Sequence, residues 1–242
     1  MYQEPRYLPA GDRALAVELG NAISPEINRA VRNLLMAIEE RSIDGVFDLV
    51  PSYRSLLVHY DPLVISLSHL EEELASLQTA ASEGTAAEPR IVHIPTLYGG
   101  EVGPDLDYVA QHNGLSSEEV VSIHSGTDYL VYMLGFSPGF PYLGGMSERI
   151  ETPRLDTPRT VIPAGSVGIA EKQTGVYPTA TPGGWQLIGR TPLIFFDPAR
   201  EPPSLVEPGD YIRFVPIGED QYSHIVRQVE EETYQVITEA AG

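Results

Sequence analysis

The segment from residue 135 to residue 189 contains most of the side chains that could bind a small molecule. Of its 55 residues, 17 are glycine or proline, yet aromatic and branched aliphatic residues are interleaved among them. This composition is typical of ordered loops with demanding backbone geometry rather than of a disordered chain. Acidic and basic residues are balanced here, whereas the whole chain has a formal net charge of −19. The segment is therefore the part of the chain that repels an anion least.

One motif in this segment matches the nucleophile elbow of serine hydrolases. Residues 135–139 read G-F-S-P-G, which fits the G-x-S-x-G pattern that presents a serine on a sharp turn. The elbow also uses the backbone N–H after the serine as an oxyanion donor, and Pro138 has no such N–H. We therefore expect a rigid loop lined by aromatic residues, and we leave the catalytic residues unassigned.

Two arginines and a glycine pair in the segment could serve a binding site. Arg154 and Arg159 each follow a proline, and either could hold a small carboxylate in a bidentate guanidinium fork. An ion pair in an exposed loop is an equally good interpretation. Gly183 and Gly184 precede Trp185, the single tryptophan of the chain, and would allow a close backbone approach beside a large aromatic wall. A tight turn that leads into a core strand is the alternative.

We expect these residues to form a substrate-binding or partner-facing pocket. Small-ligand sites are largely apolar with a few polar contacts, whereas aromatic side chains are also enriched in protein interfaces, so both uses stay open. The candidate residues are Phe136, Pro138, Phe140, Tyr142, Arg154, Arg159, Gly165, Ser166, Gln173, Thr174, Tyr177, Thr181, Gly183, Gly184 and Trp185.

Several other kinds of site are disfavoured. No glycine is followed by lysine, so the chain lacks a P-loop for ATP phosphates. The six histidines are scattered, so we expect no metal site and place each histidine on a strand or at the surface. Asp105 is expected to be a solvated turn residue before a helix. The absence of cysteine excludes disulfides and thiolate chemistry.

Charge and hydropathy limit the partners and the location. A pI near 4.5 disfavours nucleic acid, because its phosphates would be repelled. No apolar run approaches the roughly 20 residues that span a bilayer, so we expect no membrane segment. The N-terminal residues also lack an apolar signal core. These features predict a cytoplasmic protein.

Hydrophobic periodicity predicts a small N-terminal domain over residues 1–85. Ser24 and Pro25 are typical of the N-cap and first residue of a helix, and a second helix is predicted over residues 67–77. The predicted strands cover residues 14–19, 46–50 and 55–60. This βαββα order suits a ferredoxin-like αβ domain. Small polar residues at 79–89 predict a linker.

The second predicted domain covers residues 86–242. After a strand-like run at 90–95, Gly103-Pro104 opens one short helix, and Ser116 with Glu119 forms a capping box for another. A terminal helix is predicted over residues 222–229. Short strands are predicted at residues 129–134, 167–170, 185–188, 193–196 and 211–215. Regularly spaced short strands with turn signals indicate a closed or nearly closed β-barrel.

Three long motifs and one upstream run resemble the sequences of a known family. They are YMLGFSPGFPYLGGM at 132–146, TPRLDTPRTVIPAGSVGIA at 152–170, QTGVYPTATPGGWQLIGRTP at 173–192 and IPTLYGGEVGPDL at 94–106. On these residues the chain resembles the family of KipI and the B subunit of 5-oxoprolinase. That family is related to allophanate hydrolase subunit 1 and to the carboxyltransferase domain of urea carboxylase.

The resemblance implies an α+β chain, with a small ferredoxin-like αβ domain and a cyclophilin-like β-barrel domain that ends in a helix. It implies one component of an ATP-dependent 5-oxoprolinase, which converts 5-oxo-L-proline to L-glutamate and is active only with partners. The partners would be the carboxyltransferase-like C subunit, of related barrel fold, and the A subunit of 5-oxoprolinase. ATP would be used by the complex, on a chain not specified, without a covalent cofactor.

Two alternatives to the enzyme subunit stay open. One is an inhibitor of a sporulation sensor histidine kinase, the role from which the KipI name comes. The other is a component similar to allophanate hydrolase or urea carboxylase. In that case biotin would have to arrive on a partner, because the one lysine, Lys172, is not in a Met-Lys context.

Overall fold

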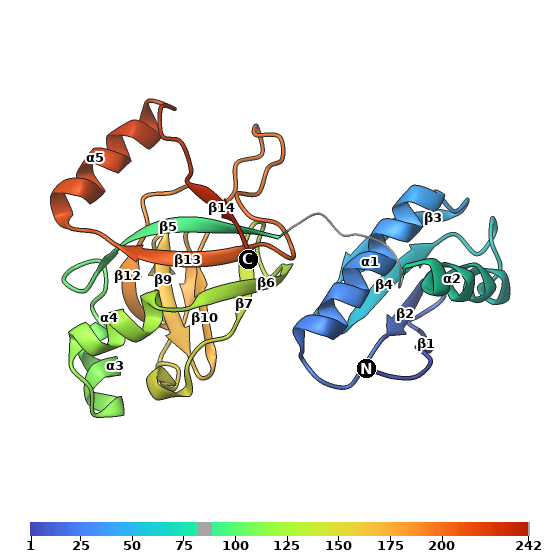
Figure 1. The fold of residues 1–242 in the computed structure, drawn as a ribbon, viewed down its shortest axis with the longest axis horizontal. Coiled ribbons are helices and arrows are strands. Elements are labelled where there is room, and N and C mark those ends of the chain that lie inside the picture. The colour runs from blue at the N-terminus through green and yellow to red at the C-terminus, as the bar shows by residue number, and fades with distance from the viewer. Residues whose placement is uncertain (82–88, 242) are drawn as a thin grey trace. The chain divides into compact units, whose positions relative to one another are not determined.

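A computed structural model describes residues 1–81 and 89–241 of the chain (Figure 1). The chain divides into two compact units, Met1–Glu88 and Pro89–Gly242, which are called unit 1 and unit 2 below. The boundary predicted from the sequence lies at residue 85, and most of the predicted linker falls outside the described residues. None of the described helices is both long enough and apolar enough to cross a membrane.

Unit 1 is a four-stranded antiparallel sheet with two helices. In spatial order, its strands are β1 (Arg6–Pro9), β2 (Ala14–Glu18), β4 (Ser55–Tyr60) and β3 (Val46–Pro51). The helices are α1 (Pro25–Arg41) and α2 (Leu67–Ala81). The order β2, α1, β3, β4, α2 follows the prediction, and the ferredoxin-like classification stays a prediction.

Local chemistry explains where α1 begins and which side it buries. The Ser24 Oγ accepts a hydrogen bond from the N–H of Ile27 at 3.2 Å, as predicted for an N-cap. The apolar stripe of the helix packs on the sheet, and its fully buried members are Ile27, Val31, Leu34 and Ile38. β1 was not predicted, because this edge strand is mostly exposed and has no apolar alternation.

Unit 2 is built around a nearly closed β-barrel. Its strands are β5 (Arg90–Tyr98), β6 (Asp128–Leu134), β7 (Pro141–Gly144), β9 (Ser166–Ala170), β10 (Gln173–Val176), β12 (Gln186–Arg190), β13 (Tyr211–Pro216) and β14 (Thr238–Ala240). They are ordered β10-β9-β12-β5-β13-β6-β7, and β14 pairs with β5. β5 and β13 run parallel, and the other pairs are antiparallel. The finer classification as cyclophilin-like stays a prediction.

The first and last strands of this order, β10 and β7, approach each other without forming a ladder. A Cβ placed on Gly175 of β10 would lie 3.5 Å from the carbonyl oxygen of Pro141 on β7. Among the described residues, no strand pairing joins β7 to β10. We call this line of contact the seam.

Helices and one small sheet surround the barrel. The helices are α3 (Leu106–Asn113), α4 (Ser117–Ser125), the 3-10 turn η1 (Glu148–Ile150) and α5 (Glu219–Glu230). The small sheet pairs β8 (Arg159–Ile162) with β11 (Thr181–Gly183). At α4 the predicted capping box is present. The Ser116 hydroxyl accepts from the N–H of Glu119, and the Glu119 carboxylate accepts from the N–H of Ser116 at 2.8 Å.

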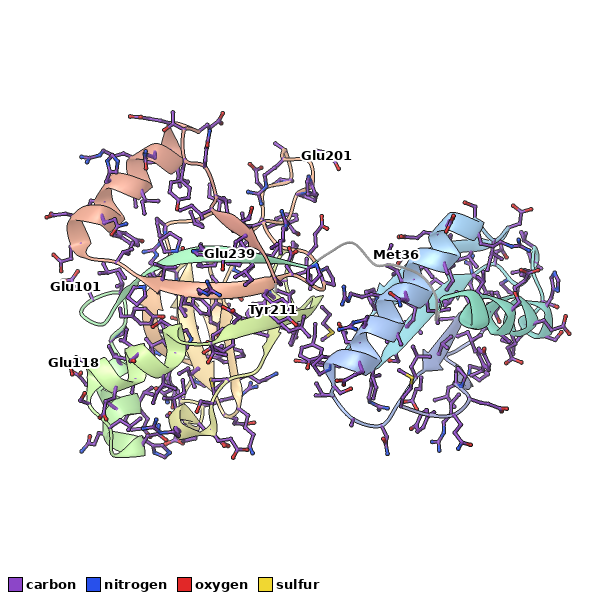
Figure 2. The ribbon with its side chains drawn as sticks, in the orientation of Figure 1. Met36, Glu101, Glu118, Glu201, Tyr211 and Glu239 are labelled. Carbon is purple, nitrogen blue, oxygen red and sulfur yellow. The ribbon has the colours of Figure 1, made fainter. Side chains whose placement is uncertain are left out.

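The C-terminal strand β14 is held by charge pairs. Arg213 on β13 donates to both carboxylate oxygens of Asp128 and to Glu239 on β14, each at 2.6 Å. Figure 2 shows Glu239 on this strand. The same figure shows Glu101, Glu118 and Glu201 on separate parts of unit 2, and all three are exposed, as expected for an acidic protein.

The predicted strand at 193–196 is wrong. Phe195 is buried as the apolar pattern indicates, but the run is a loop. The Arg200 guanidinium donates to the carbonyl oxygens of Ile194, Phe195 and Pro203, at 3.3, 3.4 and 2.9 Å respectively. The Phe195 carbonyl also accepts from the N–H of Leu205 at 2.8 Å, and Phe196 forms an isolated bridge with Ser204. The backbone contact with this neighbouring segment therefore exists but does not extend into a regular strand.

Candidate ligand-binding site

A cavity of about 380 Å³ lies on unit 2, where residues from both sides of the seam meet the small sheet. Its walls come from the β6–β7 loop, β7, β10, β11 and the turn into β12. The lining residues are Phe136, Phe140, Tyr142, Arg154, Pro158, Gln173, Tyr177, Pro182, Gly183, Gly184 and Trp185. The cavity thus gathers many of the candidates singled out from the sequence.

Phe140 is the centre of the aromatic wall. Its buried ring lies edge-on to Phe136, Tyr142, Tyr177 and Trp185, with centroid distances of 5.5, 5.4, 5.7 and 5.8 Å. Edge-to-face contacts of this kind are favourable beyond the area that they bury. The wall belongs to a small apolar cluster distinct from the barrel core, so its rings fix one another in place.

Gly183 is required by the closeness of this wall. A Cβ at this position would lie 2.7 Å from the Ile162 Cδ1 and 2.8 Å from the Tyr177 hydroxyl oxygen. Only glycine leaves room for both. The sequence-based expectation of a close backbone approach beside an aromatic wall therefore describes this turn.

Tyr177 places a protonated hydroxyl among these residues. Burial raises the pKa of Tyr177 to about 12, and the positive charges of Arg154 and Arg159 partly oppose this shift. The phenol is therefore neutral at physiological pH and can donate a hydrogen bond.

Arg159 is committed to a structural ion pair. Its Nη2 donates to Asp105 Oδ1 at 2.7 Å, and its Nη1 donates to the carbonyl oxygen of Trp185 at 3.4 Å. The second Asp105 oxygen accepts from the N–H of Leu187 at 2.6 Å. The Asp105 side chain is 13% exposed, so the expectation of a solvated turn residue is wrong. The pair fixes the start of β12, which follows Trp185.

Arg154, in contrast, lines the cavity and forms a long, exposed ion pair. Its side chain is 54% exposed, and among the described residues its ion-pair partner is Glu171, at 3.9 Å. Glu171 is also exposed. An exposed pair at this distance contributes little to stability, so the guanidinium remains accessible to a ligand.

Six of the candidates do not line the cavity, namely Arg159, Thr174 and four others. Pro138 is exposed in the β6–β7 loop, and Thr181 precedes the cavity residue Pro182. Gly165 and Ser166 form the turn into β9. The N–H of Gly165 donates to the Tyr177 carbonyl at 2.7 Å, and the N–H of Tyr177 donates to the Ser166 carbonyl at 2.9 Å. Gly165 and Ser166 therefore hold the backbone of Tyr177, which is one of the wall residues.

Thr174 also faces away from the cavity, into a buried hydrogen-bond chain. Its Oγ1 donates to the Gly168 carbonyl at 3.0 Å and lies 2.8 Å from His124 Nε2. Because that hydroxyl proton is used, His124 donates through Nε2, and its Nδ1 accepts from the Tyr98 hydroxyl at 2.8 Å. Burial lowers the pKa of His124 to about 3. The prediction of a surface or strand histidine is wrong for this helical, fully buried residue.

The loop with the elbow-like motif joins two strands, whereas a nucleophile elbow joins a strand to a helix. Phe136 within it has φ 63° and is 67% exposed. A bulky residue rarely adopts this conformation, and such strain clusters at functional sites.

Pro158 and Pro182 line the cavity but were not predicted from the sequence. Their positions directly before Arg159 and Gly183 could have indicated them.

Comparisons with known proteins give the class of the chain. Residues 5–206 match the family described as carboxyltransferase domain, subdomain C and D. The chain belongs to this family, as its motifs predicted.

Three individual proteins show how similar this chain is to particular members and relatives of the family. The 5-oxoprolinase B subunit of Bacillus subtilis (strain 168) is 47% identical, and the match covers 88% of this chain and 92% of that protein. A conserved uncharacterised protein of Pyrococcus horikoshii is 52% identical, with a TM-score of 0.54 over 90% of this chain and 100% of that chain. The Kluyveromyces lactis urea carboxylase is 22% identical, with a TM-score of 0.77 over 98% of this chain and 24% of that chain. This last likeness shows the fold alone.

Proposed function

We propose that this chain is the B subunit of a multi-component, ATP-dependent 5-oxoprolinase, which converts 5-oxo-L-proline to L-glutamate with hydrolysis of ATP. The observation that carries the proposal is the 47% identity to the 5-oxoprolinase B subunit of Bacillus subtilis, over 92% of that protein's length. The family match over residues 5–206 includes the loops that form the cavity, and function depends on such loops more than on the fold.

The proposal makes the chain a site-forming subunit that needs partners. The C subunit, of related barrel fold, and the A subunit would complete the active site, in the cytoplasm. ATP would bind outside any P-loop of this chain, because no Gly-Lys pair is present. Phe136 at the cavity and Val161 on the adjoining β8 are exposed apolar side chains. Both are suited to contact a partner that closes over the site.

Reconstitution tests this function. Glutamate release from 5-oxo-L-proline and ATP is measured for the chain alone, for the A and C subunits without it, and for all three together. Activity in the full mixture alone is the expected result. A well-folded, assembled mixture without activity would contradict the proposal and favour the kinase inhibitor or the component similar to urea carboxylase.

A further inference from the structure

We propose that the cavity of this chain binds the substrate directly, as a small flat ring that bears a carboxylate, and that Arg154 binds this carboxylate. The choice of 5-oxo-L-proline as the ligand rests on the proposed function. The ligand class follows from the walls of the cavity and from its charge.

The walls favour a small ring. At about 380 Å³ the cavity falls in the range of small-ligand sites. The rings of Phe140 and Trp185 are fixed edge-on to each other, with centroids 5.8 Å apart. Gly183 and Gly184 also line the cavity and contribute no side chain to it. A flat ring can therefore pack on aromatic surface and approach the backbone closely.

The charge favours an anion. Among the described lining residues, Arg154 is the one with a charged side chain. A ligand carboxylate that forms two parallel hydrogen bonds with its guanidinium would replace the loose 3.9 Å pair with Glu171. A cation would be repelled by Arg154 despite the aromatic surface. Arg159 does not compete for the ligand, because Asp105 already neutralises it at 2.7 Å.

The polar groups suit a lactam. A lactam presents its N–H and its carbonyl oxygen side by side. Gln173 lines the cavity and already has an interaction within the chain. Because a carboxamide has two N–H donors and an oxygen with two lone pairs, it can form a further hydrogen bond with the lactam. The protonated Tyr177 hydroxyl is a further donor within the same wall. 5-Oxo-L-proline combines a five-membered lactam ring with a carboxylate, so it matches all three features.

Trp185 allows binding to be measured at this site. It is the single tryptophan of the chain, is 8% exposed and lines the cavity, so its fluorescence reports on the cavity. The full chain, alone and assembled with the A and C subunits, is titrated with 5-oxo-L-proline and with 2-pyrrolidinone, which has the lactam without the carboxylate. We expect a saturable change with 5-oxo-L-proline and at least about tenfold weaker binding of 2-pyrrolidinone, because charged hydrogen bonds are lost.

A pair of arginine variants assigns the carboxylate contact. Arg154→Gln is expected to weaken 5-oxo-L-proline binding by about 10- to 100-fold and to leave 2-pyrrolidinone binding unchanged. Arg149→Gln is the matched control, because Arg149 is exposed and does not line the cavity. Equal melting temperatures for both variants and the parent chain would exclude misfolding as the cause.

The outcomes separate this proposal from the proposed function. In an active complex, a KM for 5-oxo-L-proline that rises at least about tenfold in Arg154→Gln, with kcat less affected, supports the cavity assignment. An active complex whose KM is unchanged by Arg154→Gln overturns that assignment and leaves the proposed function standing. An inactive complex with Arg154-dependent lactam binding overturns only the proposed function. Absence of binding to both the chain and the complex overturns the cavity assignment.

Discussion

The ion pair between Asp105 and Arg159 gives the sharpest test of how the cavity is supported. In Asp105→Ala, the Arg159 guanidinium loses its 2.7 Å partner, and the N–H of Leu187 loses its 2.6 Å acceptor. Leu187 belongs to β12, which begins directly after Trp185, and the Arg159 guanidinium also donates to the Trp185 carbonyl oxygen. The substitution should therefore destabilise unit 2 and loosen the aromatic wall.

The size of the effect follows from the burial of the pair. Removing one partner of a fully buried pair costs about 3–5 kcal/mol, whereas an exposed pair contributes about 0–1 kcal/mol. Asp105 and Arg159 are 13% and 30% exposed, so an intermediate loss of about 2 kcal/mol is expected. The unpaired Leu187 N–H adds about 1 kcal/mol. For a unit of this size, a total of about 3 kcal/mol lowers the melting temperature by about 6–12 °C.

Thermal unfolding followed by circular dichroism and by Trp185 fluorescence measures both effects. Asp156→Ala is the matched control, because Asp156 is an exposed aspartate in the same region as Arg159, and it should unfold with the parent chain. The double variant Asp105→Asn with Arg159→Gln should be more stable than the sum of the single losses. An Asp105→Ala chain that melts within about 1 °C of the parent would refute the reasoning.

Four further predictions concern the residues around the wall. Thr174→Val leaves the His124 Nε2–H without an acceptor, so we expect a loss of about 1–3 kcal/mol in urea unfolding. Between its folded pKa of about 3 and its ordinary value of 6.5, His124 takes up a proton only when unfolded. Stability should thus fall by about 1.4 kcal/mol per pH unit below 6.5, and His124→Gln should flatten this slope. Phe136→Gly relieves the positive φ, so melting temperature should rise by the equivalent of about 1 kcal/mol while lactam binding weakens. Gly165→Ala combines φ 79° with a clash against the Thr191 carbonyl, and should cost more than about 2 kcal/mol in the same unfolding assay.

Elements with local signals could be predicted from the sequence, whereas long-range pairings could not. The caps at Ser24 and Ser116 act within three residues of themselves, so the starts of α1 and α4 are readable. β5 pairs with β12, β13 and β14, all of which lie far along the chain. Periodicity shows that such strands exist but not which of them are neighbours.

The candidate site was predictable by residue type, but the direction of each side chain was not. Gln173 and Thr174 are adjacent and both polar, yet one lines the cavity and the other enters a buried hydrogen-bond chain. Strand alternation requires opposite directions but does not say which is which. Arg154 and Arg159 look equivalent in the sequence. Asp105, 54 residues from Arg159, determines which of them is neutralised.

The seam leaves one line of the barrel wall without a strand ladder among the described residues, and the cavity lies where residues from both sides of this line meet the small sheet. In the middle of the strand order, far from the seam, six residues of β5 are in register with six of β13. At the seam, Pro141 of β7 and Gly175 of β10 approach each other without a strand ladder. Among the described residues, separating β7 from β10 would therefore break no strand ladder, but it would part Phe140 from Tyr177 and Trp185. The same ring contacts that line the cavity thus also hold this side of the barrel together.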